Sequence, residues 1–121
     1  MIINNVELED LDFYDPDVME KVEKFMKKAS NMKDETRNCK SLSDFIRKSC
    51  NLIFEGFNEI FGPGTDKKIF GDTVNLKTCL VAFDEFTDEL EKQNEELLKI
   101  VEKKTNTRNF NNNYIPRKKR K

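Results

Sequence analysis

The sequence predicts an all-α domain of three main helices, with a short N-terminal strand and a flexible basic tail. Apolar side chains recur at three-and-four spacing in three long segments, which is typical of helices with one buried face. Only 36% of the 121 residues are hydrophobic, and ten phenylalanines provide the bulky groups for one core. We therefore assign residues 1–104 to a single helical domain and residues 105–121 to a basic, low-complexity tail.

The first ten residues contain a short alternating pattern. Apolar Val6 and Leu8 alternate with Glu7 and Glu9, as in a half-buried strand. Because one strand cannot form a sheet alone, it must pair with another segment or with a neighbouring subunit.

The first helix is predicted within "DPDVMEKVEKFMKKA". Asp15 can cap its N-terminus, and Pro16 suits the first helical position. Residues 30–40 show no regular spacing of apolar residues, so we interpret them as a frayed helix end followed by a linker. The helix should bury one stripe: Val18, Val22, Phe25, Met26 and Ala29.

The second helix is predicted between Ser41 and Phe61. Ser41 is a cap, with Asp44 three residues on. The helix should end at Gly62, which is expected in the left-handed conformation, and Pro63 follows because the helix cannot continue through it. Its apolar face comprises Leu42, Phe45, Ile46, Cys50, Ile53, Phe57, Ile60 and Phe61.

The third helix is predicted from a cap at Asn75 to about Lys104, with Gln93 and Asn94 interrupting its apolar seam. Together the helices predict a core centred on Phe45, Ile46, Ile53, Phe57, Phe61, Phe70, Leu80, Phe83 and Phe86.

The connection "FGPGTDKKIFG" is rich in glycine and has a lysine pair, so a phosphate-binding loop has to be considered. That motif needs a second glycine five residues after the first, between a strand and a helix. Lys67 and Ile69 occupy the positions where Gly62 and Gly64 would require it, and a helix precedes the segment. We therefore interpret it as a connector whose Ile69 and Phe70 anchor it to the core.

Composition argues against catalysis and metal binding. The chain has no histidine, and its three cysteines lack a C-x-x-C spacing. We expect no catalytic residue, no metal site and no cofactor, with Cys50 and Cys79 as buried reduced thiols. Since no apolar run approaches about 18 residues and the acidic N-terminus lacks a signal-peptide start, we expect a cytoplasmic protein that binds no membrane.

Charge separates strongly along the chain. Residues 103–121 contain eight basic residues and no acidic ones, which leaves 14 basic against 23 acidic residues in positions 1–102. Such a basic end can bind an acidic protein, nucleic acid or the acidic body of its own chain. We favour an acidic protein surface, the chain's own or a partner's, over nucleic acid. The predicted partner-binding residues here are Arg117, Lys118, Lys119, Arg120 and Lys121.

The end of the third helix is a second candidate interaction surface. Leu97, Leu98, Ile100 and Val101 continue the apolar pattern beyond its polar interruption. They predict either a partner-binding face, through self-association or a groove for a partner's helix, or a helix end packed within the monomer.

Several segments resemble proteins from the tail-gene modules of long-tailed bacteriophages and prophages of Gram-positive bacteria. The resemblance covers about residues 11–93. It lies in "DFYDPDVMEKVEK", in "SDFIRKSCNLIFEGFNEIFGPGT", in "KKIFG" and in "NLKTCLVAFDEFTDELEKQ".

The resemblance implies a tail assembly chaperone. Such small helical proteins bind the tape-measure protein, keep it soluble in the bacterial host cytoplasm and help tail-tube subunits polymerise around it. The family has no catalytic residues to transfer, and Gly62, Gly64 and Gly71 would be structural. The alternatives are a structural tail or neck component of the virion and a small nucleic-acid-binding accessory protein.

Overall fold

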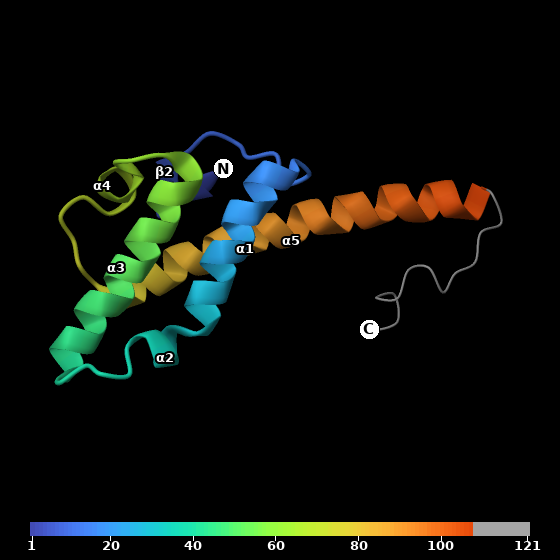
Figure 1. The fold of residues 1–121 in the computed structure, drawn as a ribbon. Coiled ribbons are helices and arrows are strands. Elements are labelled where there is room, and N and C mark those ends of the chain that lie inside the picture. The colour runs from blue at the N-terminus through green and yellow to red at the C-terminus, as the bar shows by residue number, and fades with distance from the viewer. Residues whose placement is uncertain (108–121) are drawn as a thin grey trace. The chain divides into compact units, whose positions relative to one another are not determined.

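The computed structural model describes residues 1–107 and is all-α with a short N-terminal hairpin (Figure 1). The three predicted main helices are confirmed as α1, α3 and α5. Two short helices, α2 and α4, lie within the predicted linker and connector. The described elements are β1 (Ile2–Ile3), β2 (Val6–Glu7), α1 (Pro16–Ser30), α2 (Met32–Glu35), α3 (Leu42–Phe61), α4 (Thr65–Phe70) and α5 (Leu76–Thr107).

The chain divides into two compact units, Met1–Asp88 and Glu89–Lys121. Helix α5 contributes residues to both. The predicted domain boundary after residue 104 stays a prediction, and most of the predicted tail lies outside the described residues.

The predicted strand pairs with the residues just before it. Strands β1 and β2 are antiparallel, and Ile3 stands opposite Val6. Asn4 and Asn5 have φ of 52° and 63°, the two positive values that a type I′ hairpin turn requires. The Asn4 backbone N–H donates to Oε1 of Glu85 at 2.7 Å, and its side-chain amide donates to the Ile69 carbonyl at 2.9 Å. These bonds connect the turn to α4 and α5.

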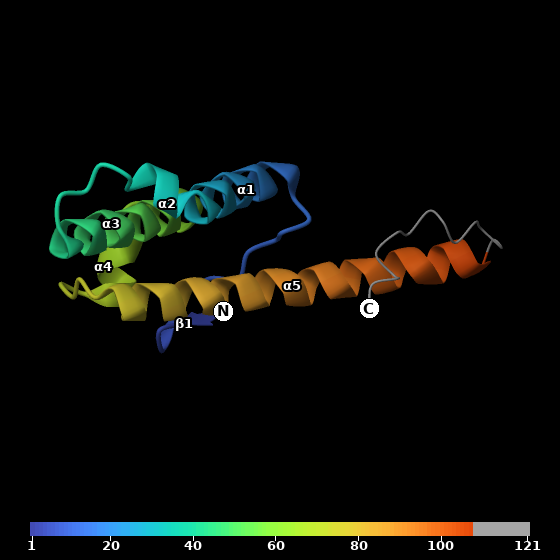
Figure 2. The ribbon, with the colours of Figure 1, turned by 90° about the horizontal axis from the view of Figure 1, so that it is seen from below.

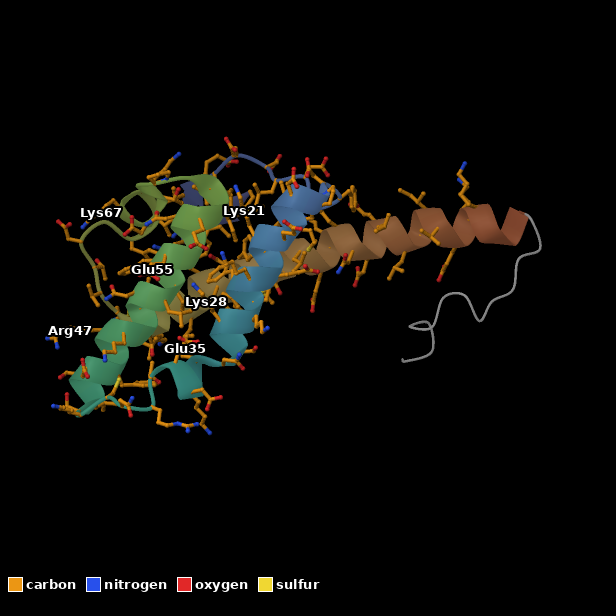
Figure 3. The ribbon with its side chains drawn as sticks, in the orientation of Figure 1. Lys21, Lys28, Glu35, Arg47, Glu55 and Lys67 are labelled. Carbon is orange, nitrogen blue, oxygen red and sulfur yellow. The ribbon has the colours of Figure 1, made fainter. Side chains whose placement is uncertain are left out.

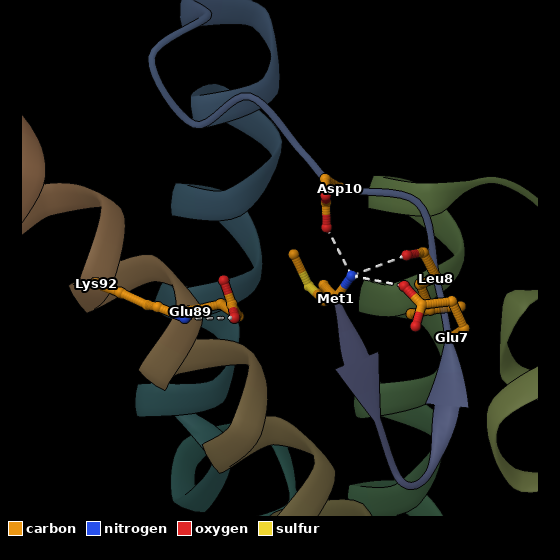
Figure 4. Close-up of polar contacts among 6 residues, drawn as sticks. All are labelled: Met1, Glu7, Leu8, Asp10, Glu89 and Lys92. Atoms are coloured by element: carbon orange, nitrogen blue, oxygen red, sulfur yellow. Dashed lines mark hydrogen bonds and ion pairs between the residues drawn. The ribbon is translucent and has the colours of Figure 1, made fainter.

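The amino group of Met1 closes the base of the hairpin (Figure 4). It donates to Asp10 Oδ1 at 2.6 Å, to Glu7 Oε2 at 3.1 Å and to the Leu8 carbonyl at 3.0 Å. The carboxylates of Asp10 and Glu7 favour the charged form, and so raise the pKa of the Met1 amino group.

The three predicted N-caps are confirmed. The side-chain oxygens of Asp15, Ser41 and Asn75 accept hydrogen bonds from backbone N–H groups of the first helical turn, at 2.8, 3.1 and 3.0 Å. Each bond satisfies a donor that the helix itself leaves unpaired.

The connector after α3 uses glycine for its backbone conformation. Gly62 ends α3 with φ 117° and ψ 158°, which lies outside the left-handed helical conformation that we predicted there but is still restricted to glycine. Gly64 is left-handed, with φ 90° and ψ −5°. Asn58 Oδ1 then accepts from the Asp66 N–H at 2.9 Å, which joins the two helices. As predicted, Ile69 and Phe70 of α4 are buried.

Within the first unit, α1 and α3 lie side by side and run in opposite directions (Figures 1 and 2). The first part of α5 forms a second layer against them (Figure 2). Aromatic rings join the layers: the Phe25 centroid lies 5.4 Å from that of Phe57 and 5.2 Å from that of Phe83, and Phe86 lies 5.8 Å from Phe57 and from Phe13.

The predicted core is confirmed at four positions and wrong at Leu80. Ile53, Phe57, Phe70 and Phe86 are buried, whereas the Leu80 side chain is 44% exposed. The buried positions of α5 are Cys79 and Phe86, both predicted to be buried, together with Ala82, which was not predicted. The other predicted core residues are only half-buried: Phe45, Ile46, Phe61 and Phe83.

Candidate protein-binding surface

The first unit carries exposed apolar residues on the outer face of α5 and in the segment just before it. We call them the outer patch: Leu76, Leu80 and Val81 on the helix, and Val74 before its first residue. The side chains of Val74, Leu80 and Val81 are 53%, 44% and 50% exposed, and Leu76 is half-buried. At about 100° per residue, Leu80 and Val81 turn away from the buried position just before them. These two side chains therefore stay exposed while Cys79 packs in the core.

The shape of the outer patch suits an extended partner better than a small molecule. Leu76, Leu80 and Val81 line an open depression of about 570 Å³ together with Lys77 and Asp84. All of its lining residues belong to consecutive turns of α5. A small-molecule pocket usually encloses its ligand between several elements, which this depression does not do. An apolar strip that is flanked by one cation, Lys77, and one anion, Asp84, can bind the apolar face of an amphipathic helix.

A second hollow lies among α1, α2 and α3. It measures about 190 Å³ and is lined by Lys28, Glu35, Thr36, Lys48, Asn51, Leu52 and Glu55. This volume is below the roughly 300–1,000 Å³ of ligand pockets. Figure 3 shows Lys28, Glu35 and Glu55 among charged side chains of both signs, which also include Lys21 and Arg47. This mixed charge is typical of a solvated surface, so we do not assign a site here.

Two thiols are buried where α3 meets α5. Cys50 and Cys79 are both fully buried, as predicted, whereas Cys39 is half-buried. Burial, reinforced by the neighbouring Cys50 thiol, raises the pKa of Cys79 to about 12. Such a thiol is unreactive at neutral pH.

The raised pKa predicts a loss of stability in alkaline solution. Between about pH 9 and pH 12 the unfolded chain releases the Cys79 proton and the folded chain retains it. The free energy of unfolding should therefore fall by up to about 1.4 kcal/mol per pH unit, and this contribution should be absent below about pH 8. Urea unfolding of wild type and Cys79→Ala at pH 7–10.5 would measure it, because other titrating groups are common to both. If the free energy of unfolding falls equally with pH in both proteins, the raised pKa of Cys79 is contradicted.

The residues predicted as partner-binding fall into two groups. Leu97 and Ile100 are 39% and 54% exposed, and Leu98 and Val101 are half-buried, all on α5 in the second unit. The basic residues Arg117, Lys118, Lys119, Arg120 and Lys121 lie outside the described residues.

The outer patch was not predicted from the sequence, because Leu80 was assigned to the core and Val81 was not considered as a surface residue. The available signal was "CLVAF", residues 79–83. Five consecutive apolar side chains cannot share one face of a helix, so at least one had to point outward.

Among residues 1–107, no three histidine, cysteine, aspartate or glutamate side chains lie where they could hold a metal ion together. No helix of this part is long and apolar enough to cross a membrane.

Comparison with known proteins places the chain in a family. The pattern of the family described as "Family of unknown function (DUF6673)" matches residues 4–121, which cover the second unit and all but the first three residues of the first. Neither the curated proteins nor the solved structures gave a match. With nearly its whole length matched, the chain belongs to the DUF6673 family.

Proposed function

We propose that this protein is a non-enzymatic tail assembly chaperone that holds an apolar helical segment of a phage tape-measure protein. The observation that supports this best is the outer patch, where Val74, Leu80 and Val81 are about half exposed on a chain whose residues are 37% charged. The resemblance of residues 11–93 to tail-module proteins supplies the class of partner.

The size of the outer patch favours a transient contact. Its exposed side chains are already about half buried, so covering each one completely contributes on the order of 1 kcal/mol. The sum of about 3–4 kcal/mol does not exceed the roughly 4–15 kcal/mol that association costs in lost freedom. The partner must therefore add contacts beyond the outer patch. A contact of this strength suits a chaperone that releases its client better than a permanent virion subunit.

The basic C-terminal end is proposed to add attraction. The eight basic residues of positions 103–121 would steer an acidic segment of the tape-measure or tail-tube protein toward the chain. Such steering is screened by salt, so it should be strongest at low ionic strength.

Co-expression with the tape-measure protein of the same phage or prophage tests the proposal. The wild-type chain should raise the soluble fraction of the tape-measure protein, and Leu80→Glu with Val81→Glu should abolish most of that increase, because buried glutamates in the contact are costly. A chain truncated after Lys104 keeps two of the eight basic residues, so it should retain part of the effect and depend less on salt.

The matched control makes the same chemical change elsewhere on α5. Leu97→Glu with Ile100→Glu also replaces two exposed apolar residues, and it should leave solubilisation intact. If the Leu80/Val81 variant raises the soluble fraction of the tape-measure protein as much as wild type does, the outer patch is not the binding surface.

Two other outcomes would favour the alternative functions. If wild type does not raise that soluble fraction and is found in purified particles, the structural virion component is favoured. Steeply salt-dependent binding to single-stranded DNA would favour the nucleic-acid-binding alternative.

A further inference from the structure

The second unit contains a helical surface with exposed apolar residues. Between Glu89 and Lys104, α5 is amphipathic, and within residues 89–107 it is the one element that the structure describes (Figure 1). Ile100 is 54% and Leu97 is 39% exposed. The apolar residues recur at three-and-four spacing along one side: Leu90, Leu97, Leu98, Ile100 and Val101.

Part of this surface has the spacing of a coiled-coil heptad. Leu90 and Leu97 are seven residues apart and Ile100 follows Leu97 by three, while Lys104 takes the next position of the repeat. The positions immediately before Leu90, Leu97 and Lys104 carry charges: Glu89, Glu96 and Lys103. In a coiled coil such flanking positions face the partner helix, and their charges select its direction.

The two halves of this segment have opposite charge. Residues 89–96 contain four glutamates and one lysine, whereas residues 97–104 contain three lysines and one glutamate. A parallel second copy would place the two net-acidic halves together and the two net-basic halves together. An antiparallel copy would place the acidic half of each chain against the basic half of the other.

We propose that residues 89–104 of α5 pair with the same residues of a second copy, in antiparallel orientation. The charge complementarity of the two halves selects this occupant and this direction. Gln93 interrupts the apolar surface and adds specificity, since a polar residue in such a seam restricts the registers that pair well. The proposal does not depend on the chaperone function, because it concerns a different set of residues from the outer patch.

The length of the segment limits the affinity. At about 1.5 Å per residue it is about 24 Å long, only about two heptads. Short helices are marginal by themselves in water. The dimer should therefore form at high micromolar concentration, and it should weaken as salt screens the charges.

Sedimentation velocity of the full chain tests the proposal between about 5 μM and 500 μM. The mass should rise from that of a 14.3-kDa monomer toward twice that value. Leu97→Glu with Ile100→Glu should raise the dissociation constant at least tenfold, and Leu80→Glu with Val81→Glu should leave it unchanged. A monomer at every concentration would overturn the proposal, as would a dimer that the Leu97/Ile100 variant does not weaken.

Charge reversal tests the direction and keeps the apolar residues intact, so it remains informative if the Leu97/Ile100 variant unfolds α5. Glu89→Lys with Glu96→Lys should weaken the dimer roughly tenfold, and so should Lys103→Glu with Lys104→Glu. Combining all four substitutions should restore affinity to within about threefold of wild type, since the halves are again opposite. If each pair of substitutions leaves the affinity unchanged, the antiparallel assignment is wrong. If the combined variant stays as weak as the single pairs, it is also wrong.

Discussion

Replacing Phe57 by alanine should lower the free energy of unfolding by roughly 3–5 kcal/mol. Phe57 is fully buried on α3, and its ring centroid lies within about 6 Å of those of four neighbouring rings: Phe25 at 5.4 Å, Phe86 at 5.8 Å, Phe70 at 6.1 Å and Phe61 at 6.2 Å. These neighbours belong to α1, α3, α4 and α5. They cannot all move inward to fill the space, so a cavity remains and their mutual contacts are lost.

Urea unfolding followed by circular dichroism measures this effect. The expected loss is a large share of the ~5–15 kcal/mol that stabilises a typical domain, and part of the Phe57→Ala population should be unfolded at 37 °C. Leu42→Ala is the matched control on α3, because Leu42 is 73% exposed and its truncation should change stability by less than about 0.5 kcal/mol. A Phe57→Ala midpoint equal to that of wild type would show that this ring does not centre the core.

Replacing Gly56 by alanine should also destabilise the protein, although alanine is the better helix former. A Cβ atom at Gly56 would come within 3.0 Å of three ring carbons of Phe25, where α1 and α3 approach each other. Alanine would gain about 1 kcal/mol in helix propensity. Overpacking typically costs about 1–3 kcal/mol, and this contact belongs at the upper end because Phe25 is itself 2% exposed and packed against other rings. We expect a net loss of about 1–2 kcal/mol.

A double-mutant cycle separates the steric cause from a general helix effect. Phe25→Leu should destabilise the protein by itself, but it removes the ring atoms that the new methyl group meets. Gly56→Ala should therefore cost less in the Phe25→Leu background than in wild type, with a coupling of at least about 1 kcal/mol. Additive effects of the two substitutions would show that the two residues do not limit the approach of the helices.

The candidate surfaces were predictable from sequence to different degrees. Leu97 and Ile100 were singled out from their spacing alone, and both are exposed. The outer patch was not, because Leu80 follows the buried Cys79 directly and precedes Phe83 by three residues, so its spacing also fits the buried side of the helix. Local spacing does not report which edge of an apolar stripe the neighbouring segments cover.

The sequence by itself determined where three helices begin and where α3 ends. The caps at Asp15, Ser41 and Asn75 form as predicted, and α3 stops at Gly62 as predicted although with a different positive-φ conformation, because capping and positive φ depend on groups within a few residues of one another. Tertiary structure alone decided that Leu80 of α5 faces outward, that position 56 has no room for a side chain, and that the Asn4 turn bonds to Ile69 and Glu85. These features depend on the packing of segments tens of residues apart, where rings of fixed size must share one volume, and residue spacing within a single segment does not contain that information.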